Sequence, residues 1–264
     1  MHPELEKLVQ MALVDGQVTD KEREIILRKA EKLGLDVDEV EMYLEGKIGF
    51  SIDQQNLSKD IILISDEVKI GNQIWMTRNL NVDSFRNGDP ISHAKTDEEW
   101  KKAGNSGKPA WCFYNNNQNN GERYGKLYNW HAVNDSRGLA PKDFIIPSNK
   151  DWIELSDFLG GLDLAGRKLK YPDFWVEGDC AKGTNESGFC GLAAGSRNFD
   201  GPFDSLGRCG HWWCSNESLY KEYRKYAAGV FYLDYNTNFV NINDDIGNNK
   251  SFGFSVRCIK FKLI

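Results

Sequence analysis

Apolar positions near the N-terminus recur every three or four residues, which is the pattern of one face of a helix. Thr19 with Glu22 three residues later forms a capping box, so a second helix begins there, and Gly34 ends it. Asp36 and Glu39 repeat the capping pattern and predict a short third helix. The apolar face of the first helix consists of Leu5, Leu8, Val9, Ala12 and Leu13. Residues 1–48 are therefore predicted to be a small all-α segment.

The pattern changes after residues 49–65, which are largely polar and are interpreted as a linker. Residues 68–70 and 73–75 alternate around a Gly-Asn turn and predict a strand pair. Ser148 and Asp151 form a capping box for a helix with Trp152, Leu155 and Phe158 facing inward. Residues 98–102 predict a short helix, Asn-rich residues 115–121 a polar loop, and the chain after Gly191 short strands and loops. Few helices, short strands and long loops predict an α+β fold over residues 66–262.

Composition and charge exclude several classes of protein. The chain has 264 residues, and 40% of them are hydrophobic, which is enough for a packed core. The net charge is −6, of which −5 lies in residues 1–48, so the larger part lacks the basic surface that nucleic-acid binding needs. No apolar run approaches the roughly 18 residues of a membrane helix. The N-terminus has no signal-peptide pattern, so we expect a cytoplasmic protein that binds neither nucleic acid nor membrane.

Several blocks of the larger part resemble, in order, the Fibrobacter succinogenes major paralogous domain. The family looks like a relative of C-type-lectin-like and sulfatase-modifying-factor folds, which implies short twisted antiparallel sheets and long ligand-presenting loops. No activity is generally established for the family. The blocks are residues 68–76 (VKIGNQIWM), 79–80 (NL), 86–91 (RNGDPI), 124–130 (YGKLYNW), 132–133 (AV), 146–148 (IPS) with Trp152, 159–161 (LGG), 184–189 (TNESGF), 210–213 (GHWW) and 253–258 (GFSVRC).

Cysteine usage agrees with a reducing compartment. The chain has six cysteines and no Cys-x-x-Cys pair, which disfavours a zinc ribbon or a thioredoxin-like motif. Exported members of the resembled family often carry a cysteine where this chain has Ala140, and that cysteine would pair with the one at Cys258. Losing such a disulfide typically costs about 2–5 kcal/mol, so its absence favours a cytoplasmic location.

Residues 12–22 (ALVDGQVTDKE) resemble a fragment of TerB-like helical domains from tellurite resistance. The resemblance implies that Asp15, Asp20 and Glu22 hold a divalent cation. Helix capping and dipole pairing explain the same acidic residues without a metal. The spacing is not that of an EF-hand.

The C-terminal part is rich in aromatic and amide side chains, which stack on ligands and offer paired donors and acceptors. Calcium could join through Asn243, Asp244 and Asp245, although the Glu-Pro-Asn type triplet of C-type lectins is absent. Apart from this calcium, no cofactor is expected. The predicted ligand-binding residues are Trp213, Asn216, Glu217, Tyr220, Tyr235, Asn236, Asn238, Asn241 and Asn243.

The sequence thus favours a non-catalytic module that binds an unknown protein or glycan, with an N-terminal helical adaptor. One alternative is implied by the resemblance to the sulfatase-modifying-factor group, whose formylglycine-generating oxidases have a cysteine where this chain has Cys214: a metal-dependent oxidase using Cys214. Cys209, His211 and Cys214 lie within six residues and could bind copper or zinc. Another is a binding protein diversified by a retroelement, since that process enriches Asn, Tyr, Asp and Ser. A third is a structural or assembly protein that forms homo-oligomers through its N-terminal helices.

Overall fold

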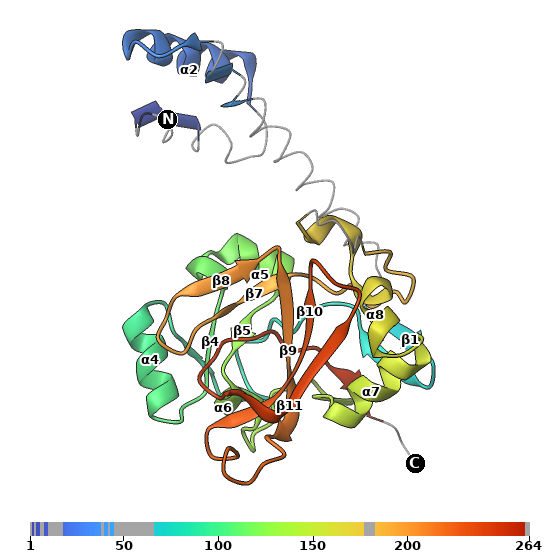
Figure 1. Cartoon of the computed structure of the whole chain (residues 1–264). Helices are drawn as coiled ribbons and strands as arrows, with labels where there is room; N and C mark the ends of the chain where they lie inside the picture. Colours follow the sequence, from blue (N-terminus) through green and yellow to red (C-terminus); the bar gives the residue numbers. More distant parts are fainter. Residues whose placement is uncertain are drawn as a thin grey trace. The chain divides into compact units, whose positions relative to one another are not determined.

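The chain divides into two compact units, Met1–Ile64 and Ser65–Ile264 (Figure 1). The computed structural model describes residues 66–176 and 183–261 of the larger unit. In the smaller unit it describes residues 18–37 and residues 2, 4, 5, 8, 9, 40, 41, 43 and 44. No helix in these described parts is long and apolar enough to cross a membrane.

Helix α2 (Asp20–Lys32) lies in the smaller unit and begins at the predicted capping box. The Thr19 side chain accepts from the Glu22 backbone N–H, and the Glu22 carboxylate accepts from the Thr19 N–H at 2.9 Å. Gly34 follows the helix with a φ of +68°, as a helix-ending glycine does. The buried apolar residues of this unit pack together and include Leu5, Val9, Ile26, Ala30, Val40 and Leu44. Glu39 of the predicted third capping pair lies outside the described residues, and so does the whole predicted linker, residues 49–65.

The larger unit begins and ends in one four-stranded sheet, with the order β1-β2-β12-β6. Strands β1 (Glu67–Ile70) and β2 (Gln73–Met76) form the predicted hairpin, whose Gly71 has a φ of +58°. Strand β12 (Ile259–Lys260) lies between β2 and β6 (Phe144–Ile145). The two ends of the unit are therefore neighbours.

The central sheet has five strands in the order β11-β10-β9-β7-β8. These are β7 (Ala194–Arg197), β8 (Phe203–Leu206), β9 (Cys209–Glu217), β10 (Ala227–Asp234) and β11 (Val240–Asn249). A smaller sheet contains β3 (Ser92–His93), β4 (Ala110–Cys112) and β5 (Leu127–Tyr128). The expectation of short antiparallel strands was too narrow. Strands β9 to β11 have eight to ten residues, and both β7–β9 and β3–β4 are parallel pairs. The coarser prediction of a mixed α+β fold is confirmed.

Two helices of the larger unit begin at capping boxes that the sequence carries. Thr96 with Glu99 caps α4 (Asp97–Asn105), and Ser148 with Asp151 caps α7 (Asn149–Phe158). The Asn-rich stretch predicted as a loop is helical instead, forming η1 (Tyr114–Asn116) and α5 (Gln118–Tyr124). The remaining helices are α6 (Trp130–Val133), α8 (Leu162–Leu169) and η2 (Pro172–Phe174).

Both faces of the central sheet are buried where β9 and β10 meet. Trp212 packs in a cluster with residues of α7 and α8, whereas Trp213 packs on the opposite face near Trp130 and Phe254. Trp152 and Leu155 point into the first cluster as predicted, but Phe158 is 64% exposed, contrary to expectation. Its ring instead covers Gly71 of the β1–β2 turn. The sheet is thus the middle layer of the unit.

The buried guanidinium of Arg257 is bonded by carbonyl and amide oxygens inside this core. Arg257 is fully buried and donates to Asn79 Oδ1 at 3.1 and 2.8 Å and to the Phe189 carbonyl. Trp212 donates to the same Asn79 oxygen at 2.8 Å. Burial lowers the pKa of Arg257. Three separate sequence blocks of the family pattern therefore meet at one oxygen, so these residues specify the fold.

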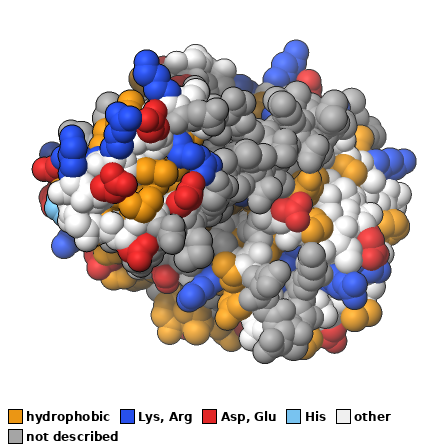
Figure 2. Space-filling model, turned by 90° about the horizontal axis from the view of Figure 1, so that it is seen from above, with side chains coloured by type: hydrophobic (Ala, Val, Ile, Leu, Met, Phe, Trp, Pro, Cys, Tyr) orange, Lys and Arg blue, Asp and Glu red, His pale blue; other side chains and the backbone are white. Residues whose placement is uncertain are grey.

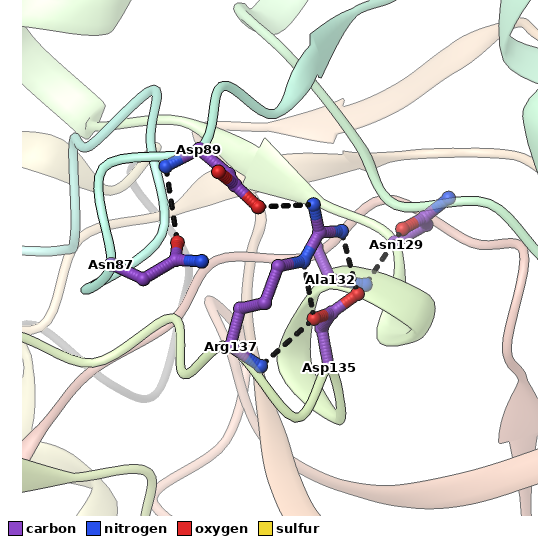
Figure 3. A network of polar contacts seen from close by, with 6 residues as sticks. All are labelled: Asn87, Asp89, Asn129, Ala132, Asp135 and Arg137. Carbon is purple, nitrogen blue, oxygen red and sulfur yellow. Dashed lines mark hydrogen bonds and ion pairs between the residues drawn. The ribbon is translucent and has the colours of Figure 1, made fainter.

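A second polar network joins two loops beside the cluster that contains Trp213 (Figure 3). Arg137 bonds the Asp135 carboxylate at 2.8 and 2.9 Å and the Asp89 carboxylate at 3.2 Å. Its guanidinium also lies 4.0 Å from the centre of the Phe85 ring. The hydrogen bonds between these two side chains lower the pKa of Asp135 and raise the pKa of Arg137. The network is a structural clamp between two loops.

Candidate functional site

The predicted ligand-binding residues separate into two groups at opposite ends of the β10–β11 hairpin (Figure 1). Tyr220 lies in the loop between β9 and β10, whereas Tyr235 follows β10 at its other end. Strand β10 has eight residues, and a strand rises about 3.3 Å per residue, so the groups lie roughly 25 Å apart. The sequence suggested one surface, and the structure contains two.

The loop of residues 218–226, called the tyrosine loop below, has its backbone fixed by the rest of the unit. The N–H groups of Leu219 and Tyr220 donate to the carbonyls of Asp244 and Asp245 at 2.9 and 3.4 Å. The Lys250 ammonium donates to the Arg224 carbonyl at 2.5 Å and to Glu217 Oε1 at 2.6 Å. These bonds hold the loop against residues 244–247, where β11 bulges between its pairs with Val230 and Ala228.

Arg224 completes this support from within the tyrosine loop. Its guanidinium donates to the carbonyls of Ser218 and Leu219 at 3.1 and 3.2 Å. The Ser218 hydroxyl donates to the Asp245 carbonyl. Sequence reasoning missed Arg224 and Lys250, because both act on carbonyls that only the folded chain brings near. No local pattern signals such a role.

The side chains of the tyrosine loop point largely to solvent. Leu219 is 52% exposed, Tyr220 50%, Tyr223 41% and Tyr226 60%, and Ile246 of the adjacent bulge is also exposed. The rings of Tyr220 and Tyr223 meet edge to face, with centroids 6.4 Å apart. Exposed aromatic groups on a fixed backbone are typical of binding surfaces, because little conformational freedom is lost on binding.

Most predicted polar residues near this loop already have partners inside the unit. Asn216 Oδ1 accepts from the Asn149 N–H at 2.9 Å, and Asp244 Oδ2 accepts from the Asn149 side chain at 3.1 Å. Glu217 bonds Lys250, as described above. Asn243 Oδ1 accepts from the N–H of Gly247 at 3.2 Å and closes the bulge. These side chains hold the loop and bulge in place.

The predicted calcium ligands do not converge. Asn243 bonds within the bulge, Asp244 bonds Asn149, and the exposed Asp245 contributes its backbone carbonyl to the tyrosine loop. Among the described residues, no three His, Cys, Asp or Glu side chains are grouped as metal ligands would be. The calcium site predicted from Asn243, Asp244 and Asp245 is therefore not assembled in this structure.

The second group forms a tight turn over residues 234–239. The Asp234 carboxylate accepts from the Asn236 N–H at 2.9 Å, and the Asn238 carbonyl accepts from the Gly166 N–H at 3.0 Å. The buried Lys170 ammonium donates to the carbonyls of Asp234 and Thr237 at 2.5 and 2.6 Å. Of the predicted residues, Asn236 is exposed, whereas Tyr235, Asn238 and the β11 residue Asn241 are half-buried. The turn is anchored mainly through its backbone.

Trp213 belongs to the core rather than to the predicted ligand surface. Its side chain is fully buried, and its indole N–H donates to the Tyr128 carbonyl at 2.7 Å. Trp212 is equally buried on the other face of the sheet. Neither ring has a face free for a ligand.

The cysteine–histidine pattern does not form one site either. Side chains alternate along β9, so Cys209 and His211 face one side of the sheet and Cys214 the other. Cys214 is fully buried, and burial raises the pKa of its thiol, which opposes the thiolate that a nucleophile or metal ligand needs. The Cys209 thiol donates to Asp234 at 3.4 Å. The residues of the oxidase alternative are thus separated.

The His211 side chain packs against aromatic rings on its side of the sheet. Its ring stacks on Phe254 and Tyr232, with centroids 4.9 and 5.7 Å apart. Burial lowers its pKa to about 4, so the imidazole is neutral near pH 7. The ring packs as an aromatic side chain among its neighbours.

The N-terminal acidic turn is only partly described. Asp15 and the side chain of Asp20 lie outside the described residues. The Glu22 carboxylate accepts from the Thr19 N–H and hydroxyl at 2.9 and 2.6 Å, which lowers its pKa. Glu22 therefore caps the helix, which is the role that explains this acidic residue without a metal.

Comparison with known proteins bears on the family of the larger unit. Searches against curated proteins and against solved structures give no match. A family model, the Fibrobacter succinogenes major domain, matches residues 68–260. The match contains every block of the ordered sequence pattern, including the residues that meet at Asn79. The chain therefore belongs to the Fibrobacter succinogenes major domain family.

Proposed function

We propose that the larger unit is a non-catalytic recognition module that binds a protein or glycan through the tyrosine loop. The observation that carries the proposal is the exposure of Leu219, Tyr220, Tyr223 and Tyr226 on a backbone that Lys250 and Arg224 hold from below. Exposed aromatic side chains supply contact area at a low entropic cost. Such side chains contribute little to stability, so we assign them to binding.

Paired variants test this proposal. We compare the full chain with Tyr220→Ser/Tyr223→Ser/Tyr226→Ser as probes on a glycan array and as baits for binding proteins. Tyr235→Ala/Asn238→Ala/Asn241→Ala tests the second group, and Phe158→Ser is the control for loss of an exposed aromatic ring elsewhere. We expect all ligands to be lost only with the tyrosine-loop variant, at an unchanged melting temperature. Ligands that survive that variant would refute the assignment.

We also propose that the fold of this unit is C-type-lectin-like. Its first and last strands share one sheet, helices flank the sheets, and long segments between strands form the surface. Oxidase chemistry at Cys214 receives no support from its buried position. An experimental structure compared with C-type lectins would test the proposed fold.

The smaller unit is proposed to act as a helical adaptor that forms homo-oligomers. Its residues Leu5, Ile26 and Leu44 share a small core, while Ile25 on α2 is exposed. Sedimentation of the full chain over a concentration series, with Ile25→Glu as the disrupting variant, tests this role. The cytoplasmic location stays a prediction, which cell fractionation checks.

Diversification of the tyrosine loop is a compatible proposal. Its backbone is held by residues other than the exposed tyrosines, so those positions can change without changing the loop's shape. A near-copy of the coding segment beside a reverse transcriptase gene would support it, and the lack of such a repeat would remove it.

A further inference from the structure

We infer that the ligand of the tyrosine loop is an acidic polypeptide segment that carries apolar side chains. This inference rests on the proposed function, because it names the class of partner for the same surface. It depends on three features of the surface: which polar groups are already bonded, which apolar groups are exposed, and how charge is distributed.

The polar groups suited to a sugar are already bonded within the unit. Carbohydrate recognition needs side-chain amides and carboxylates that are free to bond ring hydroxyls. Asn216, Asn243 and Asp244 instead bond Asn149 and Gly247, and Glu217 pairs with Lys250. A sugar stacked on Tyr220 would have to break these bonds to gain specific contacts. The surface is therefore poorly suited to carbohydrate.

The exposed apolar groups suit a polypeptide. Leu219 and Ile246 are aliphatic and more than half exposed, and they flank Tyr220 because the Tyr220 N–H bonds the carbonyl of Asp245. Aliphatic side chains offer no flat face for a sugar ring, but they bury readily against apolar protein side chains. Tyrosines beside aliphatic residues are a composition typical of protein interfaces.

Charge on the loop selects an acidic partner. Residues 220–226 (YKEYRKY) contain Lys221, Arg224 and Lys225 against Glu222, which gives +2, whereas the chain as a whole is −6. Lys221 and Lys225 are exposed, and among the described residues neither makes an ion pair. On the face that Figure 2 shows, acidic and basic side chains are intermixed. A basic, tyrosine-rich loop is thus a local feature of an acidic chain.

The carboxylates beside the loop limit where the acidic partner lies. Asp244 and Asp245 lie in the bulge, and their carbonyls bond the N–H groups of Leu219 and Tyr220. Lys221 and Lys225 lie further along the loop, and the Lys225 ammonium is 5.3 Å from the centre of the Tyr226 ring. We expect apolar side chains of the partner over Leu219 and Ile246, and its carboxylates beside Lys221 and Lys225.

The test measures binding of a fluorescent Glu/Tyr copolymer to the full chain by anisotropy. Poly-glutamate tests charge without apolar groups, and heparin tests an anionic carbohydrate. We expect the copolymer to bind more tightly than either. Between about 50 and about 300 mM NaCl its affinity should fall about threefold or more, because exposed charges are screened.

Variants assign the binding to the loop. Tyr220→Ser/Tyr223→Ser should weaken copolymer binding by about tenfold or more. Lys221→Glu/Lys225→Glu changes the charge of residues 220–226 from +2 to −2, so it should weaken binding and abolish the loss of affinity at high salt. The matched control, Lys101→Glu/Lys102→Glu on exposed positions of α4, should leave binding unchanged.

Several outcomes would overturn the inference. One is heparin binding as tightly as the copolymer. Another is an affinity for the copolymer that the loop variants leave unchanged. A neutral glycan lost with the tyrosine variant but not with the lysine variant would overturn this inference while leaving the proposed function standing. If no ligand depends on the tyrosines, both fail.

Discussion

Lys170 carries a positive charge inside the unit, and this buried charge should make stability depend on pH in a calculable way. The side chain is fully buried, its ammonium lies 5.0 Å from the centre of the Trp175 ring, and its two hydrogen-bond acceptors are backbone carbonyls. Burial lowers its pKa from 10.5 to about 8, and the nearby Asp234 opposes this only in part. The folded state therefore releases this proton more readily than the unfolded chain does.

The sign and size of the effect follow from proton linkage. Between pH 8 and 10.5 the unfolded chain binds more protons at this lysine, so stability rises with pH over that window. At about 1.36 kcal/mol per pKa unit, the full effect is about 3 kcal/mol. Between pH 7.5 and 10, which covers most of the window, wild type should gain about 2 kcal/mol relative to Lys170→Met.

Urea unfolding of wild type and Lys170→Met at both pH values measures this difference. Cysteines and tyrosines of the unfolded chain also titrate in this range, but they do so in both proteins, and their effects cancel in the comparison. Lys150→Met, at an exposed position of α7, is the control and should follow wild type at both pH values. If wild type and Lys170→Met change stability in parallel, the pKa of Lys170 is not lowered and the reasoning fails.

Three further substitutions test the packing described above. Asn79→Ala removes the acceptor of the buried Arg257 and should destabilise the unit by about 3 kcal/mol in urea unfolding; a loss below about 1 kcal/mol would mean that water replaces the amide. Gly166→Ala lies in a helix, where alanine usually stabilises by up to about 1 kcal/mol. Its Cβ would lie 2.4 Å from the Asn238 carbonyl oxygen, so we expect a lower melting temperature, and a higher one would contradict the close approach. Ser148→Ala should cost about 1 kcal/mol through loss of the α7 cap, and an unchanged melting temperature would show that the cap adds nothing.

The parts of the fold that depend on neighbours in the sequence were predictable. The capping boxes at Thr19 and Ser148 place the starts of α2 and α7, and the Gly-Asn turn places the β1–β2 hairpin. Each signal requires only residues three or four positions apart. The prediction of a loop for the Asn-rich stretch was wrong for a related reason. Asn117 was interpreted as a loop residue, but its side chain caps α5.

Burial of both faces of one strand was harder to foresee. Trp212 and Trp213 are adjacent in β9, so they point to opposite faces, and each meets a different packing layer. A strand with one exposed face would leave one of them available to a ligand. The sequence of β9 (CGHWWCSNE) contains His211 and ends in polar residues, so it lacks the continuous apolar run that indicates a doubly buried strand.

The composition of the candidate surface was predictable from the sequence, but the arrangement of its residues was not. Its tyrosines and amides were predicted to bind a ligand, and that prediction did not foresee that Asn149 and Asp244, 95 positions apart, bond each other. Such pairings depend on the tertiary fold, and no local pattern distinguishes an amide that holds a bulge from one that is free. For the same reason, Tyr220 and Tyr235 were assigned to one surface although a whole strand separates them.

The pairing of β12 with β2, next to β1, determines how this unit fits into a longer polypeptide. The chain enters at Glu67 and leaves at Lys260, and these two side chains form an ion pair at 2.8 Å. Segments fused before and after the unit would therefore start from almost the same point, whatever the length of the loops between. The whole unit can be inserted into a surface turn of another protein, and changes in the tyrosine loop would leave that attachment point untouched.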